Sequence, residues 1–173
     1  MSLPDRKIEW SHASFRDWQL FLAKSAAGLC YISTPGEQFE DFSAKITKKF
    51  KGHEMVENPQ ALEPYIRELQ EYFNGTSRTL SLPIDAKGTP FQEEIWQALQ
   101  EIPYGTTVSY SEIAQRINRP TAVRAVGAAI GANPVLITVP CHRVIGKNGT
   151  MTGFRAGIDF KQFLLALEKE KFQ

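Results

Sequence analysis

The second half of the chain contains two helix start signals that strongly limit how it can fold. Thr89–Gln92 and Ser109–Glu112 both match the capping box, in which a Ser or Thr and a Glu or Gln three residues later bond each other's backbone N–H groups. Each box is followed by apolar residues at helical spacing, and Pro103–Gly105 separates the two stretches. The sequence therefore predicts two helices here.

A third helix is expected from Thr121, as its N-cap residue, to about Ala132. The turn at Asn118–Pro120 separates it from the helix that begins after Ser109, and two short helices joined by such a turn form a helix-turn-helix. Pro134–Pro140 (PVLITVP) is expected to be extended and buried, and Asp159 is expected to cap a last helix.

The first half indicates mixed α and β structure. We expect strands at Trp18–Ala23 and Leu29–Ser33, a weaker strand at Lys45–Phe50, a helix from Pro59 to Phe73 and an extended segment at Thr79–Ile84. The short polar segment 85–88 is the predicted linker. It separates a domain of residues 1–84 from a domain of residues 89–173.

Composition excludes several classes of protein. A hydrophobic fraction of 42% and a net charge of +1 exclude a disordered chain. Apolar runs stay far below the ~20 residues that a membrane span needs, and the first ten residues lack the apolar core of a secretory signal. Two cysteines and three histidines form neither a disulfide scaffold nor a zinc-ligand pattern. We therefore expect a soluble cytoplasmic protein with reduced thiols and no metal.

Positive charge is concentrated in one stretch of this nearly neutral chain. Residues 104–157 hold six basic side chains and a single acidic one, Glu112. Such an excess can steer a polyanion to one face, although an ordinary solvated surface explains it equally well.

The expected helix at 121–132 consists mostly of Ala and Gly. Because each Gly costs about 1 kcal/mol relative to Ala, this composition indicates that something approaches the helix closely. Tight packing against another helix is one alternative, and a nucleic acid groove is the other. Arg124, the one charged residue of the helix, lies in its first turn, where a phosphate is favoured. Arg124 therefore favours DNA.

Cys141 lies in the sequence Pro-Cys-His-Arg-Val at 140–144. Neighbouring His142 and Arg143 are the kind of residues that lower a thiol pKa and so favour the reactive thiolate. Cys30, between Leu29 and Tyr31, has no such neighbours and is interpreted as a small buried hydrophobe. We interpret Cys141 as a nucleophile.

These motifs resemble those of the O6-alkylguanine-DNA alkyltransferases, also called methylated-DNA–protein-cysteine methyltransferases. The resemblance rests on PCHRV at 140–144, RAVG at 124–127 and GANP at 131–134, and it extends from about residue 89 through 168. It implies an α+β fold of two domains. The first would be a small α/β, ribonuclease-H-like domain, and the second a mostly helical, winged-helix-like domain with the helix-turn-helix.

The resemblance also implies three groups of site residues. The reacting group comprises Cys141 as alkyl acceptor, His142 as its base through a water, Glu168 orienting His142, Tyr110 as hydrogen-bond or proton donor to guanine, and Asn133 bracing the turn. The DNA-binding group comprises Arg124, which fills the gap left by a flipped nucleotide, with Thr121, Ala125, Ala128 and Gly131. The substrate pocket comprises Pro140, Val144, Phe154, Arg155 and Ala156. Phe154 departs from the family, which often has Tyr there.

The implied function is direct reversal of DNA damage. An alkyl group, mainly methyl, passes irreversibly from O6-alkylguanine, or from O4-alkylthymine, to Cys141. The implied partner is double-stranded DNA, contacted in the minor groove with base flipping by a monomer that uses no cofactor. Two rival hypotheses are a helix-turn-helix protein that binds DNA without reacting and a thiol hydrolase that uses Cys141 and His142.

Overall fold

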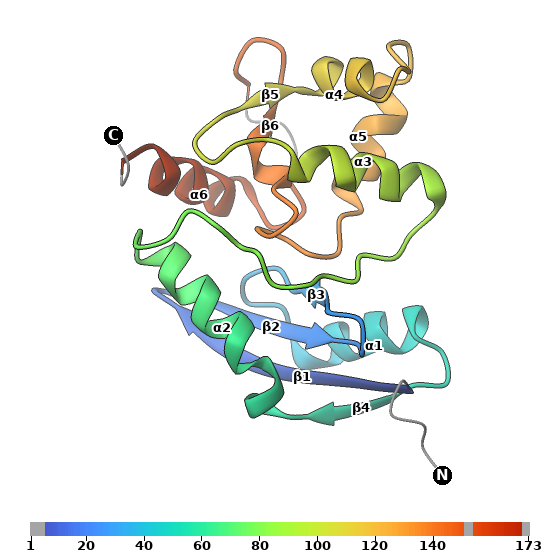
Figure 1. The fold of residues 1–173 in the computed structure, drawn as a ribbon, viewed down its shortest axis with the longest axis vertical. Helices are drawn as coiled ribbons and strands as arrows, with labels where there is room; N and C mark the ends of the chain where they lie inside the picture. Colours follow the sequence, from blue (N-terminus) through green and yellow to red (C-terminus); the bar gives the residue numbers. More distant parts are fainter. Residues whose placement is uncertain (1–5, 151–153, 171–173) are drawn as a thin grey trace. The chain divides into compact units, whose positions relative to one another are not determined.

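The computed structural model of the chain describes residues 6–150 and 154–170. It separates into two compact units, Met1–Ala86 and Lys87–Gln173, and each is considered by itself (Figure 1). The first unit contains the larger sheet and the second is mostly helical, which confirms the predicted α+β class.

The first unit is built on a four-stranded sheet in the order β3-β2-β1-β4. Its strands are β1 (Lys7–Phe15), β2 (Trp18–Lys24), β3 (Leu29–Ile32) and β4 (Glu54–Glu57). β2 pairs antiparallel with both β1 and β3, whereas β4 pairs parallel with β1. The two strands predicted at 18–23 and 29–33 are confirmed, and β1 and β4 lie outside the predicted strands.

Two helices cover opposite faces of this sheet, α1 (Phe39–Lys49) and α2 (Pro59–Phe73) (Figure 1). Phe21 of β2 stacks on Phe42 of α1 with ring centroids 4.7 Å apart, and Phe15 of β1 stacks on Phe73 of α2 at 5.1 Å. His12 pairs with Phe21 across the strands and lies three residues from Phe15. Since side chains alternate along a strand, the two stacks lie on opposite faces.

The strand predicted at Lys45–Phe50 is wrong, because residues 45–49 belong to α1. Phe42 and Ile46 are four residues apart and both buried, so they form one helical stripe against the sheet. The lysines around Ile46 lie on the outer side of that helix.

The predicted helix at 59–73 is confirmed as α2. Asn58 caps it by accepting a hydrogen bond from the backbone N–H of Ala61. In the segment predicted as extended at Thr79–Ile84, Ile84 forms an isolated bridge with Leu29. The described part of that segment contains no strand.

The second unit consists of four helices and short connecting elements along its described residues. They are α3 (Pro90–Gln100), β5 (Val108–Ser109), α4 (Tyr110–Arg116), α5 (Val123–Gly131), a 3-10 turn (Cys141–Arg143), β6 (Val144–Ile145) and α6 (Ile158–Glu170). Both capping boxes are confirmed, at the starts of α3 and α4. β5 and β6 form a parallel pair, which joins the segment before α4 to the segment after the 3-10 turn.

α4 and α5 form the predicted helix-turn-helix, but α5 begins later than expected. Thr121 does not cap it. The backbone N–H of Ala122 bonds to the carbonyl of Arg119, so Thr121 remains in the turn, and α5 begins at Val123 without a side-chain cap. The last helix likewise begins at Ile158, which places Asp159 inside its first turn and not at the cap.

The segment 134–140 is buried as predicted, but it is folded into turns and is not extended. The backbone N–H of Val139 bonds to the carbonyl of Val135, and Ile137 has a positive φ of 73°. A β-branched residue seldom adopts this conformation, so surrounding contacts must hold it.

Candidate active site

Cys141 begins the 3-10 turn directly before β6, and it is 3% exposed. Asn133 organises the approach to it. The Asn133 side chain donates to the carbonyl of Val139 at 2.8 Å and accepts from the N–H of Val135 at 2.9 Å. The N–H of Cys141 donates to the same Val139 carbonyl at 2.8 Å. One amide side chain thus ties together both ends of the segment that positions the thiol.

Burial raises the pKa of the Cys141 thiol above its ordinary value. A hydrogen bond with Asn133 and the positive charges of Arg155 and Lys161 act in the opposite direction. Burial therefore keeps the thiol neutral, whereas the groups around it favour the thiolate.

The side chain that follows Cys141 in the sequence belongs to a buried polar cluster. His142 is fully buried, and its Nε2–H donates to Oε2 of Glu168 at 2.7 Å. Arg143 donates to both oxygens of Glu168, from Nε and Nη2, each at 2.9 Å, and from Nη1 to the carbonyl of Ile102 at 2.8 Å. The N–H of Gly105 also donates to Glu168 at 3.0 Å.

This cluster sets the charges of its members. Burial alone would raise the pKa of Glu168, but the bonds from His142 and Arg143 outweigh it and hold that pKa well below its usual range. Burial lowers the pKa of His142, and the bond to Glu168 offsets this only in part. His142 is therefore neutral near pH 7. Because Nε2 carries the proton toward Glu168, Nδ1 is the nitrogen that can accept one.

The sequence predicts that Arg143 lowers the pKa of the neighbouring Cys141 thiol, but in the structure Arg143 bonds to another group. Its guanidinium is paired with Glu168. Two other cations, Arg155 and Lys161, lower the pKa of the Cys141 thiol. The predicted pocket residues include Arg155 but not Lys161. The available signal for Lys161 is its spacing, because it lies on α6 one turn before buried Leu164.

Cys141 opens on a small pocket with a volume of about 20 Å³. The lining residues are Tyr110, Gly127, Ile130, Gly131, Leu136, Cys141, Phe154 and Arg155. This volume holds about one water molecule, so a nucleobase can enter only after lining side chains move.

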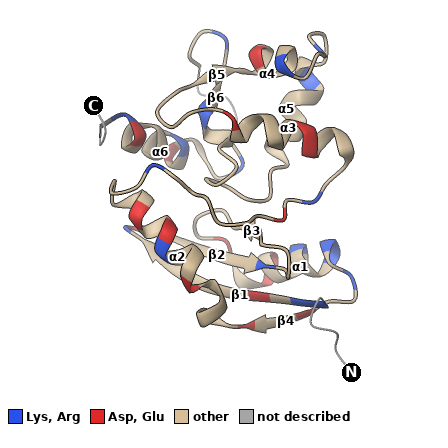
Figure 2. Ribbon diagram, in the orientation of Figure 1, with Lys and Arg blue, Asp and Glu red and all other residues tan. Residues whose placement is uncertain are grey.

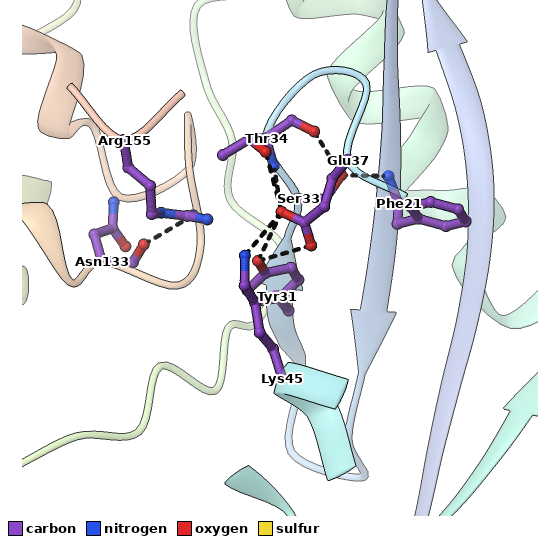
Figure 3. A network of polar contacts seen from close by, with 8 residues as sticks. All are labelled: Phe21, Tyr31, Ser33, Thr34, Glu37, Lys45, Asn133 and Arg155. Carbon is purple, nitrogen blue, oxygen red and sulfur yellow. Dashed lines mark hydrogen bonds and ion pairs between the residues drawn. The ribbon is translucent and has the colours of Figure 1, made fainter. Parts of the chain in front are cut away.

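Only some of the residues predicted for the substrate pocket line it in the structure. Phe154 and Arg155 line the pocket, whereas Pro140 and Val144 are buried near it and Ala156 is partly exposed. Arg155 Nη2 donates to the backbone carbonyl of Asn133 at 3.1 Å (Figure 3).

The helix α5 presents its small residues outward. Val126 and Ile130 are buried, whereas Ala125, Ala128 and Gly131 are exposed. A Cβ added to Gly131 would meet no heavy atom within 4 Å. Close packing against another helix does not explain this face.

Basic side chains surround this exposed face. Arg124 is exposed in the first turn of α5, Arg116 is exposed at the end of α4, and Arg119 and Thr121 are exposed in the turn between them. Figure 2 shows basic residues along this part of the helix-turn-helix. Tyr110, at the start of α4, lies about 3.8 Å from the position of a Cβ on Gly127. The pocket therefore opens beside the outer face of the helix-turn-helix.

A second polar cluster lies in the first unit and stabilises a loop. Glu37 accepts hydrogen bonds from Tyr31, from the N–H and hydroxyl of Thr34, and from Lys45, at 3.0–3.3 Å (Figure 3). Its side chain is only 4% exposed. Each carboxylate oxygen is occupied, so this cluster closes a loop against the sheet.

Within 6–150 and 154–170, no group of three or more His, Cys, Asp or Glu side chains could hold a metal ion. None of the helices in this part of the chain is long and apolar enough to cross a membrane.

Comparison with known proteins assigns both halves of the chain. Residues 8–86 match the family model of the 6-O-methylguanine DNA methyltransferase ribonuclease-like domain, and residues 90–170 match that of the 6-O-methylguanine DNA methyltransferase DNA-binding domain. The inducible methylated-DNA–protein-cysteine methyltransferase of Bacillus subtilis is 51% identical over 162 residues, which cover 94% of this chain and 90% of that protein.

Solved structures agree with the sequence comparison. The Mycobacterium tuberculosis O6-methylguanine methyltransferase superposes with a TM-score of 0.83 and 36% identity, over 96% of this chain and 95% of that one. A crystal structure of the M. tuberculosis protein in complex with DNA superposes with a TM-score of 0.82 and 37% identity, over 94% of each chain.

Proposed function

Since the chain belongs to the family of O6-methylguanine DNA methyltransferases, we propose that it repairs DNA by moving an alkyl group from guanine O6 to its own Cys141. The observation that carries this proposal is the buried thiol of Cys141, followed in the sequence by a neutral His142 whose Nε2–H is held by Glu168. Such a base is needed to ionise a buried thiol, and a protein that only binds DNA has no need of one.

The transfer is a displacement at the alkyl carbon. His142 accepts the thiol proton, through a water as the family resemblance implies, and the sulfur electron pair attacks the carbon. The S–C bond forms as the C–O6 bond breaks, and the electron pair of that bond leaves with guanine. The hydroxyl of Tyr110, which lines the same pocket, donates a hydrogen bond or proton to the leaving base. The thioether resists displacement by water, so each molecule reacts once.

Access to the alkyl carbon requires base flipping. The carbon is stacked inside a duplex, and extrusion of the nucleotide costs a few kcal/mol. The exposed small residues of α5 suit close approach to the minor groove, and Arg124 in its first turn can fill the gap that the nucleotide leaves. The complex of the M. tuberculosis relative with DNA supports DNA as the partner.

The same displacement applies to larger alkyl groups and to O4-alkylthymine, because the leaving atom is again an oxygen attached to an aromatic ring. Every group that the reaction uses belongs to the second unit, so a monomer suffices and no cofactor is needed.

Mass spectrometry tests this proposal. After incubation with a duplex that contains O6-methylguanine, the protein should gain the mass of one methylene, on the peptide that contains Cys141, with one methyl group removed per molecule. C141S should gain nothing, and C30S should react like the wild type. An unchanged wild-type mass despite duplex binding would indicate a DNA-binding protein without transfer. Continuous release of product from a thiol-hydrolase ester would indicate the hydrolase.

A further inference from the structure

Lys161 is a buried lysine for which the proposed reaction assigns no role. It lies on α6 and is 1% exposed. Its ammonium donates a hydrogen bond to the backbone carbonyl of Val144 at 2.6 Å. Lysine is almost never fully buried unless it is paired, because desolvating an ammonium is costly.

Among the residues that the structure describes, Lys161 has no carboxylate partner. Within residues 6–150 and 154–170, no Asp or Glu lies within ion-pair distance of its ammonium. Glu168, also on α6, is committed to His142 and Arg143.

The surroundings of Lys161 lead to the reactive sulfur. The ammonium lies 5.6 Å from the centroid of the Phe154 ring, and Phe154 and Cys141 line the same pocket. Val144, its hydrogen-bond partner, is the residue directly after the 3-10 turn that Cys141 begins. The lysine thus bonds to the chain directly after the 3-10 turn and lies beside a ring that lines the pocket of the thiol.

We propose that Lys161 is the buried counter-charge of the Cys141 thiolate, an inference that rests on the proposed role of Cys141 as nucleophile. The ammonium remains protonated throughout. It compensates the negative charge that forms on sulfur when the thiol proton leaves, in a place where solvent cannot. Lys161 therefore acts through Cys141 and transfers no proton itself.

The electrostatics of the site support this division of roles. The charge of Lys161 lowers the pKa of Cys141, as does that of Arg155, while burial lowers the pKa of Lys161 and Cys141 raises it. Lys161 also lowers the pKa of His142, and so it does not favour the protonated base. The side chains that act on the thiol are Asn133, Arg155 and Lys161. The lysine favours the anion, and in the proposed reaction His142 takes the proton.

Three substitutions separate charge from hydrogen bonding and packing. K161M keeps the stem and removes both the charge and the donor. K161Q keeps a donor for the Val144 carbonyl without charge, and K161R keeps the charge. K169M, at an exposed position on the same helix, is the control for loss of one positive charge.

The measurement is the titration of the Cys141 thiol in the protein without DNA, followed by thiolate absorbance and by the rate of iodoacetamide reaction against pH. All variants are made in the C30S background, so that Cys141 is the only thiol of the chain and the titration can be followed above pH 10. We expect K161M and K161Q to raise the pKa of Cys141 by about one pH unit or more, and K161R and K169M to leave it nearly unchanged.

Two outcomes would overturn the inference. One is a thiol titration in K161Q that matches the wild type while thermal unfolding is affected, which would assign Lys161 to packing alone. The other is an equal shift in K169M. If K161M does not fold, the comparison of K161Q with K161R decides the matter. Since the titration uses no DNA, failure of alkyl transfer in the wild type would refute the proposed function separately.

Discussion

His142 Nε2 lies 2.7 Å from Oε2 of Glu168, and the same carboxylate accepts two hydrogen bonds from Arg143. One buried carboxylate thus orients the proposed base and neutralises a guanidinium. E168Q should therefore destabilise the protein by about 3 kcal/mol, because it leaves the Arg143 charge unpaired in the interior. It should also slow alkyl transfer. Urea unfolding and single-turnover rates measure the two effects, with exposed Glu94→Gln as the control. Unchanged stability would contradict the assigned pairing.

The same cluster predicts how stability depends on acid pH. Because burial lowers the pKa of His142, the unfolded chain binds a proton below about pH 6.5 that the native protein does not. Glu168 adds a second loss below its ordinary value of 4.5, since its native pKa is lowered. The contribution of His142 and Glu168 to stability should be complete above pH 6.5 and fall as pH falls. H142Q should flatten the fall between pH 6.5 and 5, measured by urea unfolding. H12Q, at an exposed position, should not.

The parts of the fold that the sequence predicted are those controlled by local chemistry. The two capping boxes and the Asn58-Pro59 helix start depend on contacts within about four residues, and the structure has all three. The strand predicted at 45–50 failed because Ile46 and its neighbours are compatible with either structure, and packing of Phe42 against the sheet decides for helix. The turn at 134–140 depends on the Asn133 side chain, which no apolar pattern reveals.

The site shows the same limit. The Pro-Cys-His-Arg sequence places the proposed base, His142, directly after Cys141. Two other features depend on how α6 packs against the 3-10 turn: the pairing of Arg143 with Glu168 and the approach of Lys161 to the thiol. These residues are far apart in the sequence, so the spacing of residues within one helix or turn does not predict their contacts.

Arg124 offers a test of the base-flipping proposal. It is exposed in the first turn of α5 and lies outside the residues that line the Cys141 pocket. R124A should slow repair of O6-methylguanine in a duplex by about 100-fold or more, because loss of an inserted side chain costs a few kcal/mol of the flipping energy. Reaction with free O6-benzylguanine should change little. Arg67→Ala, on the exposed surface of α2, is the charge-matched control. Equal losses on both substrates would refute the finger role.

The outer face of α5 offers a test of close approach. Ala128 is exposed, so A128L should change stability by no more than about 0.5 kcal/mol. A larger side chain there should nevertheless weaken duplex binding at least about tenfold if this face meets the groove. Fluorescence anisotropy with a labelled duplex measures binding, and Gln97→Leu on the exposed side of α3 controls for added hydrophobicity. Undiminished binding by A128L would place the DNA elsewhere.

Cys30 predicts a loss of stability at alkaline pH that is independent of the reaction. Burial raises its pKa from 9.0 to about 12, so between these values the unfolded chain loses a proton that the native protein keeps. The contribution of Cys30 to stability is therefore complete below pH 9 and lost as pH rises toward 12, at up to about 1.4 kcal/mol per pH unit. C30A leaves a cavity and should be less stable at pH 8. Its free energy of unfolding should nevertheless fall less steeply than that of the wild type between pH 9 and 11, because other titrating groups contribute equally to both proteins. Parallel curves would mean that the Cys30 thiol ionises as readily in the native protein as in the unfolded chain.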